Sequence, residues 1–355
     1  MRNDRLLASF GFAIVAAALY APQAALAACT PTGFNITTGY GSTSGDDGNP
    51  VVNMTAAMVN PGNVSGDVNA SGCDIGVYFG PGQHGQVSHA NVRGAKYHGI
   101  VNNGANVDIE DSSISDIGDL TSGVSRGYGI FVYGGAGRAS GDIHGNTVWR
   151  YQKNGIVVAG QHADANVESN WVIGQGQTPR IAQNGIEVID GADAQVTGNV
   201  VTGDAYTGGG SGVPPGENQA AGILIYGGEC YPGVPTALVT GIRVEHNVVT
   251  NSDIGVELTN CASPGVAATT PTKNTVDDNA LINNAVTSVN TTPPYQAGIQ
   301  AIGAGDTITD NDTCGPGFAD SAPAHAIDAA LDTGAKLKNN TVCRPLHDQG
   351  HGHSH

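Results

Sequence analysis

Two glutamates occupy matching places in the sequence, and their residue type and spacing suggest chemistry. Glu187 follows Gly185-Ile186 and Glu257 follows Gly255-Val256, so each is the second residue after a glycine that opens a strand-forming run. Paired carboxyl groups serve as general acid and general base when glycosidic bonds are hydrolysed. Whether these two meet depends on the elements that carry them.

The segment around Glu187 is one copy of a unit that recurs along the chain. Its first half reads Gly-Ile-x-Val, and the aligned copies begin at Gly76, Gly99, Gly129, Gly155, Gly185, Gly222, Gly255 and Gly298, with Ala326 as a ninth. Its second half reads V/I-x-x-N-x-V, and the asparagine position holds Asn146, Asn170, Asn199, Asn247, Asn279, Asn311 and Asn340, with Ala90 and Ser112 in the earliest copies. The shortest intervals between the aligned glycine and asparagine positions give a repeat unit of about 22 residues. Such a fixed period predicts a solenoid.

Each unit is long enough for three short strands and three turns, and it must stack on its neighbours to bury its apolar side. Stacking places equivalent residues about 4.8 Å apart. Ile186 and Val188 then point inward and Glu187 points outward. We expect the aligned asparagines to form a ladder at one corner, where each amide binds backbone groups of a turn and the amide of the next coil.

This pattern resembles the right-handed parallel β-helix of the pectate-lyase-like superfamily, over roughly Cys73 to Cys343. The resemblance implies an all-β fold, a single-stranded right-handed parallel β-helix of about nine coils with an N-terminal cap. In enzymes of that fold the substrate lies across the strand that corresponds to Gly-Ile. The fold also hosts non-catalytic binding proteins, and the motifs of pectate lyases and polygalacturonases are incomplete in this chain, so the activity must be argued from the site.

The resemblance and the composition together suggest four segments. We expect a signal peptide over 1–28, an N-terminal cap over 29–72, the β-helix domain over 73–345 and a disordered His-rich tail over 346–355. The signal peptide is indicated by Arg2 and Arg5, an apolar run of 15 residues and the small-residue site Ala25-Leu26-Ala27. That run is too short for a transmembrane segment, and no other comes close.

Export predicts a secreted or periplasmic protein. An alternative is a lipid anchor, because Leu26-Ala27-Ala28-Cys29 looks like a lipobox in which Cys29 becomes the acylated N terminus. The position of Pro22-Gln23 and the even number of cysteines favour ordinary secretion.

The repeat register suggests how the six cysteines pair. Cys314 and Cys343 each follow an aligned asparagine by three residues, so they occupy the same place in adjacent coils. Cys230 and Cys261 follow aligned glycines in adjacent coils. Cys29 and Cys73 remain, and a Cys29–Cys73 bond would pin the N-terminal segment to the first coil.

The formal net charge of −17 restricts the partners. An acidic surface repels phosphate backbones, so we expect no nucleic acid. It is compatible with neutral or cationic glycans, or with calcium. No motif indicates a cofactor and no zinc pattern is present, so we expect no metal site. We also expect a monomer. The C-terminal histidines from His347 to His355 have the composition of a weak metal-binding tail.

The outward residues define the candidate site. Glu187 and Glu257 lie two coils apart, so their carboxylates are expected about 9–10 Å apart, close to the 6.5–9.5 Å or so used by inverting glycosidases. Tyr133 and Tyr226, one outward position further along, could stack on sugar rings, and Gln300 is a further substrate-binding candidate. The alternatives are that the glutamates are solvated surface residues and that the tyrosines pack under loops.

These residues predict an exported protein that binds or processes polysaccharide along one face of the solenoid. As an enzyme it would be a polysaccharide lyase or a glycoside hydrolase. The alternative is a non-catalytic structural or adhesive protein of the cell surface. Long insertions follow Asn199, Gly222, Gly255 and Asn279, and we expect them to wall the binding face on coils five to eight.

Overall fold

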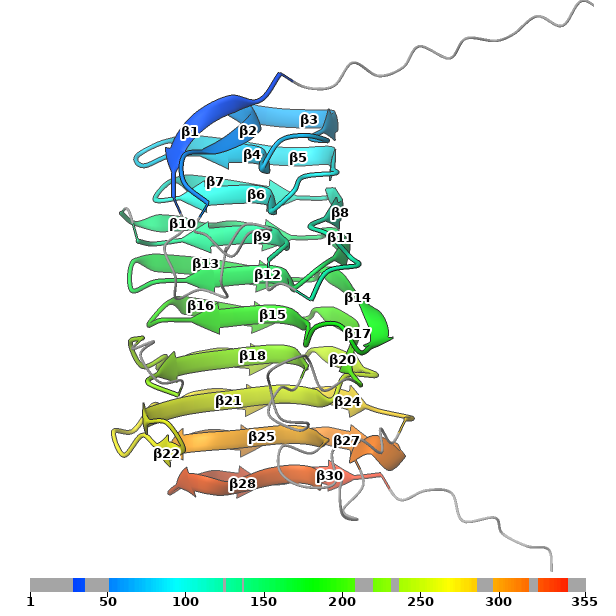
Figure 1. Ribbon diagram of the computed structural model, residues 1–355. Helices are drawn as coiled ribbons and strands as arrows, with labels where there is room; N and C mark the ends of the chain where they lie inside the picture. The colour runs from blue at the N-terminus through cyan, green and yellow to red at the C-terminus, as the bar shows by residue number, and fades with distance from the viewer. Residues whose placement is uncertain are drawn as a thin grey trace, which may run out of the picture.

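The fold is a tall column of short strands (Figure 1). The computed structural model describes residues 28–35, 51–123, 126–135, 137–207, 220–230, 236–285, 296–318 and 325–343. The expected signal peptide up to Ala27, the glycine-rich insertion at 208–215 and the His-rich tail lie outside the described residues. In the described part, the elements are strands apart from one 3-10 turn, η1 (Pro316–Phe318), and no helix there could cross a bilayer.

Each coil contributes one strand to each of three parallel stacks. The first, called here the Gly-Ile stack, contains β2 (Met54–Val59), β4 (Ile75–Phe79), β6 (His98–Asn103), β9 (Tyr128–Tyr133), β12 (Asn154–Ala159), β15 (Asn184–Ile189), β18 (Ala221–Gly228), β21 (Ile254–Ser263), β25 (Ala297–Ala304) and β28 (His325–Thr333). Two short strands pair antiparallel with it, β1 (Thr30–Phe34) with β2 and β22 (Val266–Ala267) with β21.

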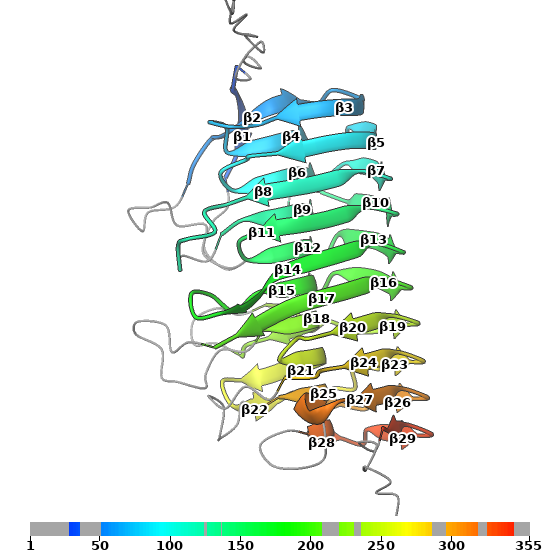
Figure 2. The ribbon, with the colours of Figure 1, turned by 90° about the vertical axis from the view of Figure 1, so that its right-hand side faces the viewer.

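The other two stacks follow in each coil, before and after the asparagine corner (Figure 2). The second stack contains β7 (Asn106–Glu110), β10 (Ala139–His144), β13 (Ala163–Glu168), β16 (Asp193–Thr197), β19 (Arg243–Glu245), β23 (Thr275–Asp277), β26 (Thr307–Thr309) and β29 (Lys336–Lys338). The third contains β8 (Ser113–Ile117), β11 (Thr147–Tyr151), β14 (Trp171–Thr178), β17 (Val200–Tyr206), β20 (Val248–Thr250), β24 (Ala280–Ile282), β27 (Asp312–Cys314) and β30 (Thr341–Val342). At the N-terminal end, β3 (Asn63–Asn69) pairs with β5 (His84–Arg93), and β5 runs through both stacks.

The strand register confirms the alignment of the repeats on glycine. Ile186 pairs with Ile223 of the next coil, and Ile299 pairs with Ile327, so the aligned residues stack directly. Glycine is needed because a Cβ on Gly99 would lie 2.4 Å from the carbonyl oxygen of Gly129 in the next coil, and the same clash recurs at the aligned glycines before and after it. Ala326 is tolerated because no strand follows β28 in this stack among the described residues.

The inward residues form one continuous core, as the alternation predicts. Ile186 and Val188 are fully buried, and their equivalents in the other coils join the same apolar cluster along the column. Each inward residue packs against its counterparts above and below, which is the contact a single coil cannot provide.

The asparagine ladder is present and continuous. The buried Asn199 donates its Nδ2 to the carbonyl of Val167 at 2.8 Å and to Oδ1 of Asn247 at 3.0 Å. Its own Oδ1 accepts the backbone N–H of Asn170 at 2.9 Å. The residue before each corner has a positive φ, for example 54° at Ser169, a conformation that turns the chain sharply and is disfavoured for most side chains. The ladder satisfies the backbone groups exposed by that turn.

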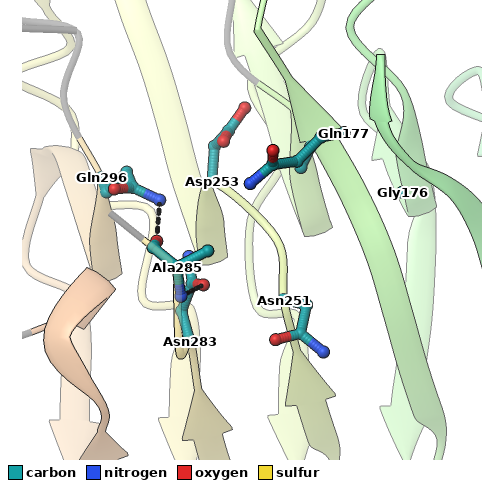
Figure 3. A pocket seen from close by; sticks show the side chains of 8 residues that line it. Gly176, Gln177, Asn251, Asp253, Asn283, Ala285 and Gln296 are labelled. Carbon is teal, nitrogen blue, oxygen red and sulfur yellow. Dashed lines mark hydrogen bonds between the residues drawn. The ribbon is translucent and has the colours of Figure 1, made fainter. Parts of the chain in front are cut away.

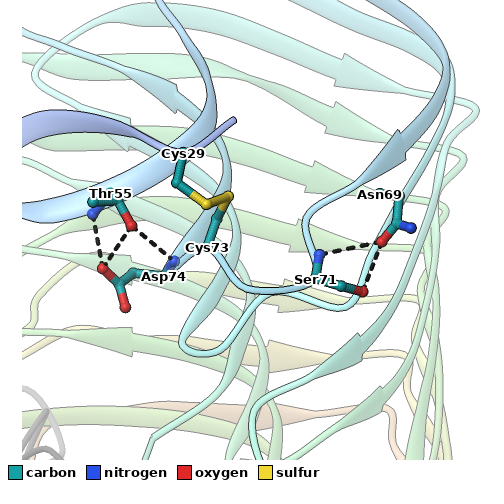
Figure 4. The surroundings of a disulfide bond; sticks show 6 residues. All are labelled: Cys29, Thr55, Asn69, Ser71, Cys73 and Asp74. Carbon is teal, nitrogen blue, oxygen red and sulfur yellow. Dashed lines mark hydrogen bonds between the residues drawn. A yellow bond between two sulfur atoms is a disulfide. The ribbon is translucent and has the colours of Figure 1, made fainter. Parts of the chain in front are cut away.

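The N-terminal region joins the column instead of only covering its end. Strands β2 and β3 pair in parallel with β4 and β5, so residues 54–69, expected within the cap, extend the stacks by one strand each. β1 then lies antiparallel at the edge of β2. The segment is held by a disulfide between Cys29 and Cys73, and beside it Thr55 donates its backbone N–H and hydroxyl to Asp74 (Figure 4).

Phe34, at the end of β1, packs on the outward face of the Gly-Ile stack. Its ring lies 5.7 Å from that of Tyr78 and 6.5 Å from that of Phe131. The outward positions of the first coils are therefore buried in a second apolar cluster, which includes Val101 and Val157. These outward positions do not face solvent, because large apolar side chains occupy them and Phe34 packs over part of the row.

The three expected disulfides are all present. Cys29–Cys73, Cys230–Cys261 and Cys314–Cys343 have Cα–Cα distances of 5.4, 5.0 and 4.7 Å. Three such bonds are typical of extracellular or periplasmic proteins. A sulfur held in the Cys29–Cys73 bond has no thiol to accept a lipid, which argues against the lipid-anchored alternative.

We predict that Asn199→Ala lowers the free energy of unfolding by about 1–3 kcal/mol, because it leaves buried backbone groups of two neighbouring coils without partners. The measurement is chemical denaturation followed by circular dichroism. The matched control is Asn166→Ala, whose side chain makes an exposed hydrogen bond to Asp142. Equal effects of the two substitutions would show that the ladder contributes no special stability.

We also predict that peptide mapping by mass spectrometry, without reduction, recovers Cys314 linked to Cys343 and Cys230 linked to Cys261. Both pairs join adjacent coils in this register. A peptide that links Cys314 to Cys230 would contradict the coil alignment itself.

Candidate functional site

Glu187 and Glu257 lie on the outward face of the Gly-Ile stack, as the repeat predicts. The register pairs Glu187 on β15 with Leu224 on β18, and Leu224 with Glu257 on β21. Two strand spacings separate the two glutamates, which corresponds to about 10 Å between their backbones. Both side chains are half-buried.

The surroundings of Glu187 favour its charged form more than those of Glu257 do. Burial raises the pKa of the Glu187 carboxyl, and the Lys153 ammonium and hydrogen bonds from Asn184 and Asn154 oppose that rise. Asn154 donates its Nδ2 to Glu187 Oε2. Asn154 and Asn184 are paired residues on adjacent strands, at the position just before the aligned glycine.

Glu257 has fewer stabilising neighbours. Burial raises the pKa of its carboxyl, and the charge of Glu187 raises it further. The opposing influences are a hydrogen bond from the Thr259 hydroxyl, with Oγ1 2.9 Å from Glu257 Oε1, and the more remote charge of Lys153. The two carboxyl groups therefore sit in different electrostatic environments on one face.

Lys153 supplies the positive charge of the site. It lies two residues before Gly155 and donates its Nζ to the carbonyl of Ala182 at 2.5 Å. Burial lowers the pKa of its ammonium, and the charges of Glu187, Glu257 and Asp204 act in the opposite direction. A half-buried lysine among carboxylates can hold charge in place or bind a hydroxyl oxygen of a ligand.

Two fully buried aspartates lie at the adjoining corner, between the third stack and the start of the Gly-Ile strands. Asp204 accepts a hydrogen bond from the Tyr151 hydroxyl at 2.6 Å, and burial raises the pKa of its carboxyl well above the ordinary value. Asp253 accepts the backbone N–H of Tyr206 at 2.7 Å. The backbone N–H of Asp253 donates in turn to the carbonyl of Asp204 at 3.1 Å, which ties the two coils together.

Asp253 also lines a cavity of about 180 Å³ at this corner (Figure 3). The wall includes several amide side chains, and its residues are Gly176, Gln177, Ala205, Asn251, Asp253, Asn283, Ala285 and Gln296. Part of the wall is fixed internally, because Gln296 donates to the carbonyl of Ala285 at 3.0 Å. Asp253 directly precedes β21, the strand that carries Glu257 four residues further along.

The structure separates the other expected site residues. Tyr226 lies on β18, between the strands of the two glutamates, and is half-buried. Gln300 follows Glu257 on the next strand but is only 8% exposed. Tyr133 lies two strands before Glu187, stacked on Phe131 with ring centroids 5.4 Å apart and with Phe34 at its edge. Its ring is therefore engaged in the aromatic cluster and lies away from the glutamates.

Sequence reasoning missed Lys153, Asn154, Asp204 and Asp253. The signal was available in the register, since Lys153 and Asp253 both stand two residues before an aligned glycine. Among the described residues, no group of three or more His, Cys, Asp or Glu side chains could hold a metal ion.

One family model matches the chain. Residues 66–231 match the model described as "Right handed beta helix region". A search of curated protein sequences gave no match.

Solved structures with the same general architecture share little sequence with this chain. The Dettilon tailspike protein has 15% identity and a TM-score of 0.39, over 79% of this chain and 61% of its own. The catalytic domain of a GH87 α-1,3-glucanase has 12% identity and a TM-score of 0.35, over 76% of this chain and 54% of its own. An alginate lyase from Paenibacillus sp. str. FPU-7 has 11% identity and a TM-score of 0.33, over 81% of this chain and 100% of its own.

The parallel stacks, the register of the repeats and the matched family model agree on the architecture. The chain folds as a parallel β-helix with the repeats and register that its sequence predicts, and residues 66–231 match the model of the right-handed β-helix region.

Proposed function

We propose that this protein is an exported glycan-processing enzyme that hydrolyses a polysaccharide lying across the Gly-Ile stack at β15 to β21. The observation that carries the proposal is the pair of half-buried glutamates two coils apart, each with a raised pKa, on one outward face. Their spacing suits an inverting mechanism, in which a water molecule fits between one carboxylate and the sugar.

The two environments suggest which glutamate does what. Lys153 and two amide donors favour the ionised form of Glu187, which suits a general base that takes a proton from water. Burial and the charge of Glu187 favour the protonated form of Glu257, which suits a general acid that protonates the leaving oxygen. Opposite protonation of two nearby carboxyl groups is the arrangement that glycoside hydrolysis requires.

The charge of the protein favours a neutral glycan. The whole chain carries a formal net charge of −17. A uronate polymer, the substrate of a polysaccharide lyase, would be repelled unless a cation intervened. A hydrolase acting on an uncharged polysaccharide is therefore the better fit among the expected enzyme classes.

The alternative of a non-catalytic glycan binder predicts a different result at the same residues. A binder needs no proton transfer, so removing a carboxyl charge while keeping its shape would alter affinity alone. The activity test below separates the two.

We predict that the purified protein releases reducing ends from at least one member of a panel of neutral polysaccharides. Glu187→Gln and Glu257→Gln should each lower kcat by about 10²–10⁴-fold, the usual size of an acid or base contribution, with little change in KM. An aryl glycoside with a good leaving group should restore part of the Glu257→Gln activity and none of the Glu187→Gln activity.

The matched control is Glu168→Gln, which removes an exposed carboxylate from the second stack and should leave turnover unchanged. Activity retained in the double variant Glu187→Gln, Glu257→Gln would refute the catalytic assignment. Glycan binding without release of reducing ends or unsaturated products would establish the binder.

We also predict a pH-dependent stability difference that needs no substrate. The folded-state pKa of Glu187 is raised above its unfolded value, so this carboxyl contributes stability below the unfolded pKa, and that contribution is lost as pH rises through the folded pKa. The unfolding temperature of the wild-type protein should therefore fall, relative to that of Glu187→Gln, as the pH rises from about 4 to neutrality. The lower limit is near the ordinary glutamate pKa. Thermal melts across this range measure the difference, and parallel curves would contradict the raised pKa.

A further inference from the structure

Both tryptophans of the chain are exposed on one face, away from the glutamates. Trp149 lies on β11 and Trp171 on β14, adjacent strands of the third stack (Figure 2). Trp171 is 54% exposed and Trp149 is 38% exposed. Val200 and Val248 continue the row of Trp171 on β17 and β20 and are exposed to a similar degree. Large apolar side chains exposed side by side in this way often mark a binding surface.

This face is poor in charge, although the protein as a whole is strongly acidic. The two outward positions on each of the six strands β8, β11, β14, β17, β20 and β24 hold no Asp, Glu, Lys or Arg. The exposed ion pair of Arg150 and Asp116 lies beside Trp149, at the next position of β11 and of β8. Further charged residues border the two ends, with Arg93 on β5 and Asp312 on β27. We call these outward positions the tryptophan face.

The geometry of the tryptophan face is flat and narrow. The six strands are stacked in parallel register and span about 24 Å at about 4.8 Å per strand. The register pairs Trp149 with Ile173, two residues beyond Trp171, so the two tryptophan Cα atoms are about 8 Å apart on the diagonal. The Arg150 guanidinium lies 5.8 Å from the centroid of the Trp149 ring and covers part of the face of that ring. The Trp171 ring is therefore the more accessible of the two for stacking.

We propose that the tryptophan face is a second glycan-binding site, which holds an uncharged polysaccharide chain along the column axis by stacking sugar rings on Trp171 and Trp149. Indole rings present a broad apolar surface with an N–H at one edge, which suits the apolar face and the hydroxyl rim of a pyranose ring. The threonines that share the row, among them Thr202 and Thr250, add hydroxyl groups without charge. This site binds without chemistry and is independent of Glu187 and Glu257.

The size of the face favours a single glycan chain over a second copy of the protein. Two outward rows about 7 Å apart, over about 24 Å, give roughly 170 Å² for each copy. A stable protein interface buries about 800 Å² for each partner. Two acidic copies would also have to bring their charged flanks together at the edges of this strip.

The test uses the fluorescence of the two tryptophans, which report on this face alone because the chain has no others. The full-length protein is titrated with laminarin, hydroxyethylcellulose, dextran and a galactomannan, and with alginate as the anionic comparison. We expect a saturable blue shift with at least one neutral polysaccharide and none with alginate. Trp171→Ala should weaken that binding at least 10-fold in affinity gel electrophoresis, and Trp149→Ala less.

Matched variants keep the result interpretable. Val266→Ala removes an exposed apolar side chain elsewhere and should leave affinity unchanged. Trp171→Tyr, which keeps an aromatic ring, should restore most of the affinity lost in Trp171→Ala. The Glu187→Gln, Glu257→Gln double variant should show the same fluorescence titration as the wild type, so failure of the proposed hydrolysis leaves this result standing.

Two outcomes would overturn the proposal. The first is the absence of a saturable fluorescence change with every neutral polysaccharide of the panel. The second is a blue shift that depends on protein concentration without glycan, together with a doubled mass in solution, which would show that the face pairs two copies of the chain.

Discussion

The register between coils is the constraint on which the rest of the structure depends. Two close contacts enforce it, one at each end of the repeat. At the glycine position the next coil's carbonyl comes so near that no Cβ fits. At the asparagine position each side chain, such as that of Asn199, donates to a backbone carbonyl of its own turn and to the side-chain amide of the next coil. A slip by one residue would lose both contacts and turn every inward side chain outward.

This register explains why distant residues can form one site. Glu187 and Glu257 are 70 positions apart in the chain, yet they are separated by a single intervening strand because one aligned position repeats in each coil. Inward positions are restricted to apolar residues by the continuous core. Outward positions are free of that restriction, so each face can acquire its own chemistry without disturbing the core.

The sequence was sufficient for the parts of the fold that repeat. The glycine and asparagine positions predicted the stacks, the register and the disulfide Cys314–Cys343, because each depends on the same local rule in every coil. The sequence was insufficient for contacts that do not follow the repeat. Phe34 packs on Phe131 across nearly a hundred positions, and that contact buries an outward face that periodicity alone describes as exposed. Lys153 and Asp204 were missed because their importance comes from neighbours in other coils.

The two proposed sites would place different demands on a bound glycan. In the proposed hydrolysis, the glycan has to hold one glycosidic bond between two carboxyl groups, closely enough for proton transfer to and from them. On the tryptophan face every stacked ring contributes alike, and a chain can shift along the column without losing all of its contacts. A sugar repeat that differs from the strand spacing falls out of step with the rows after a few residues. Under the two proposals, affinity on the tryptophan face would depend on the two indoles more than on the length of the strip, and the glutamate site alone would select which bond is broken.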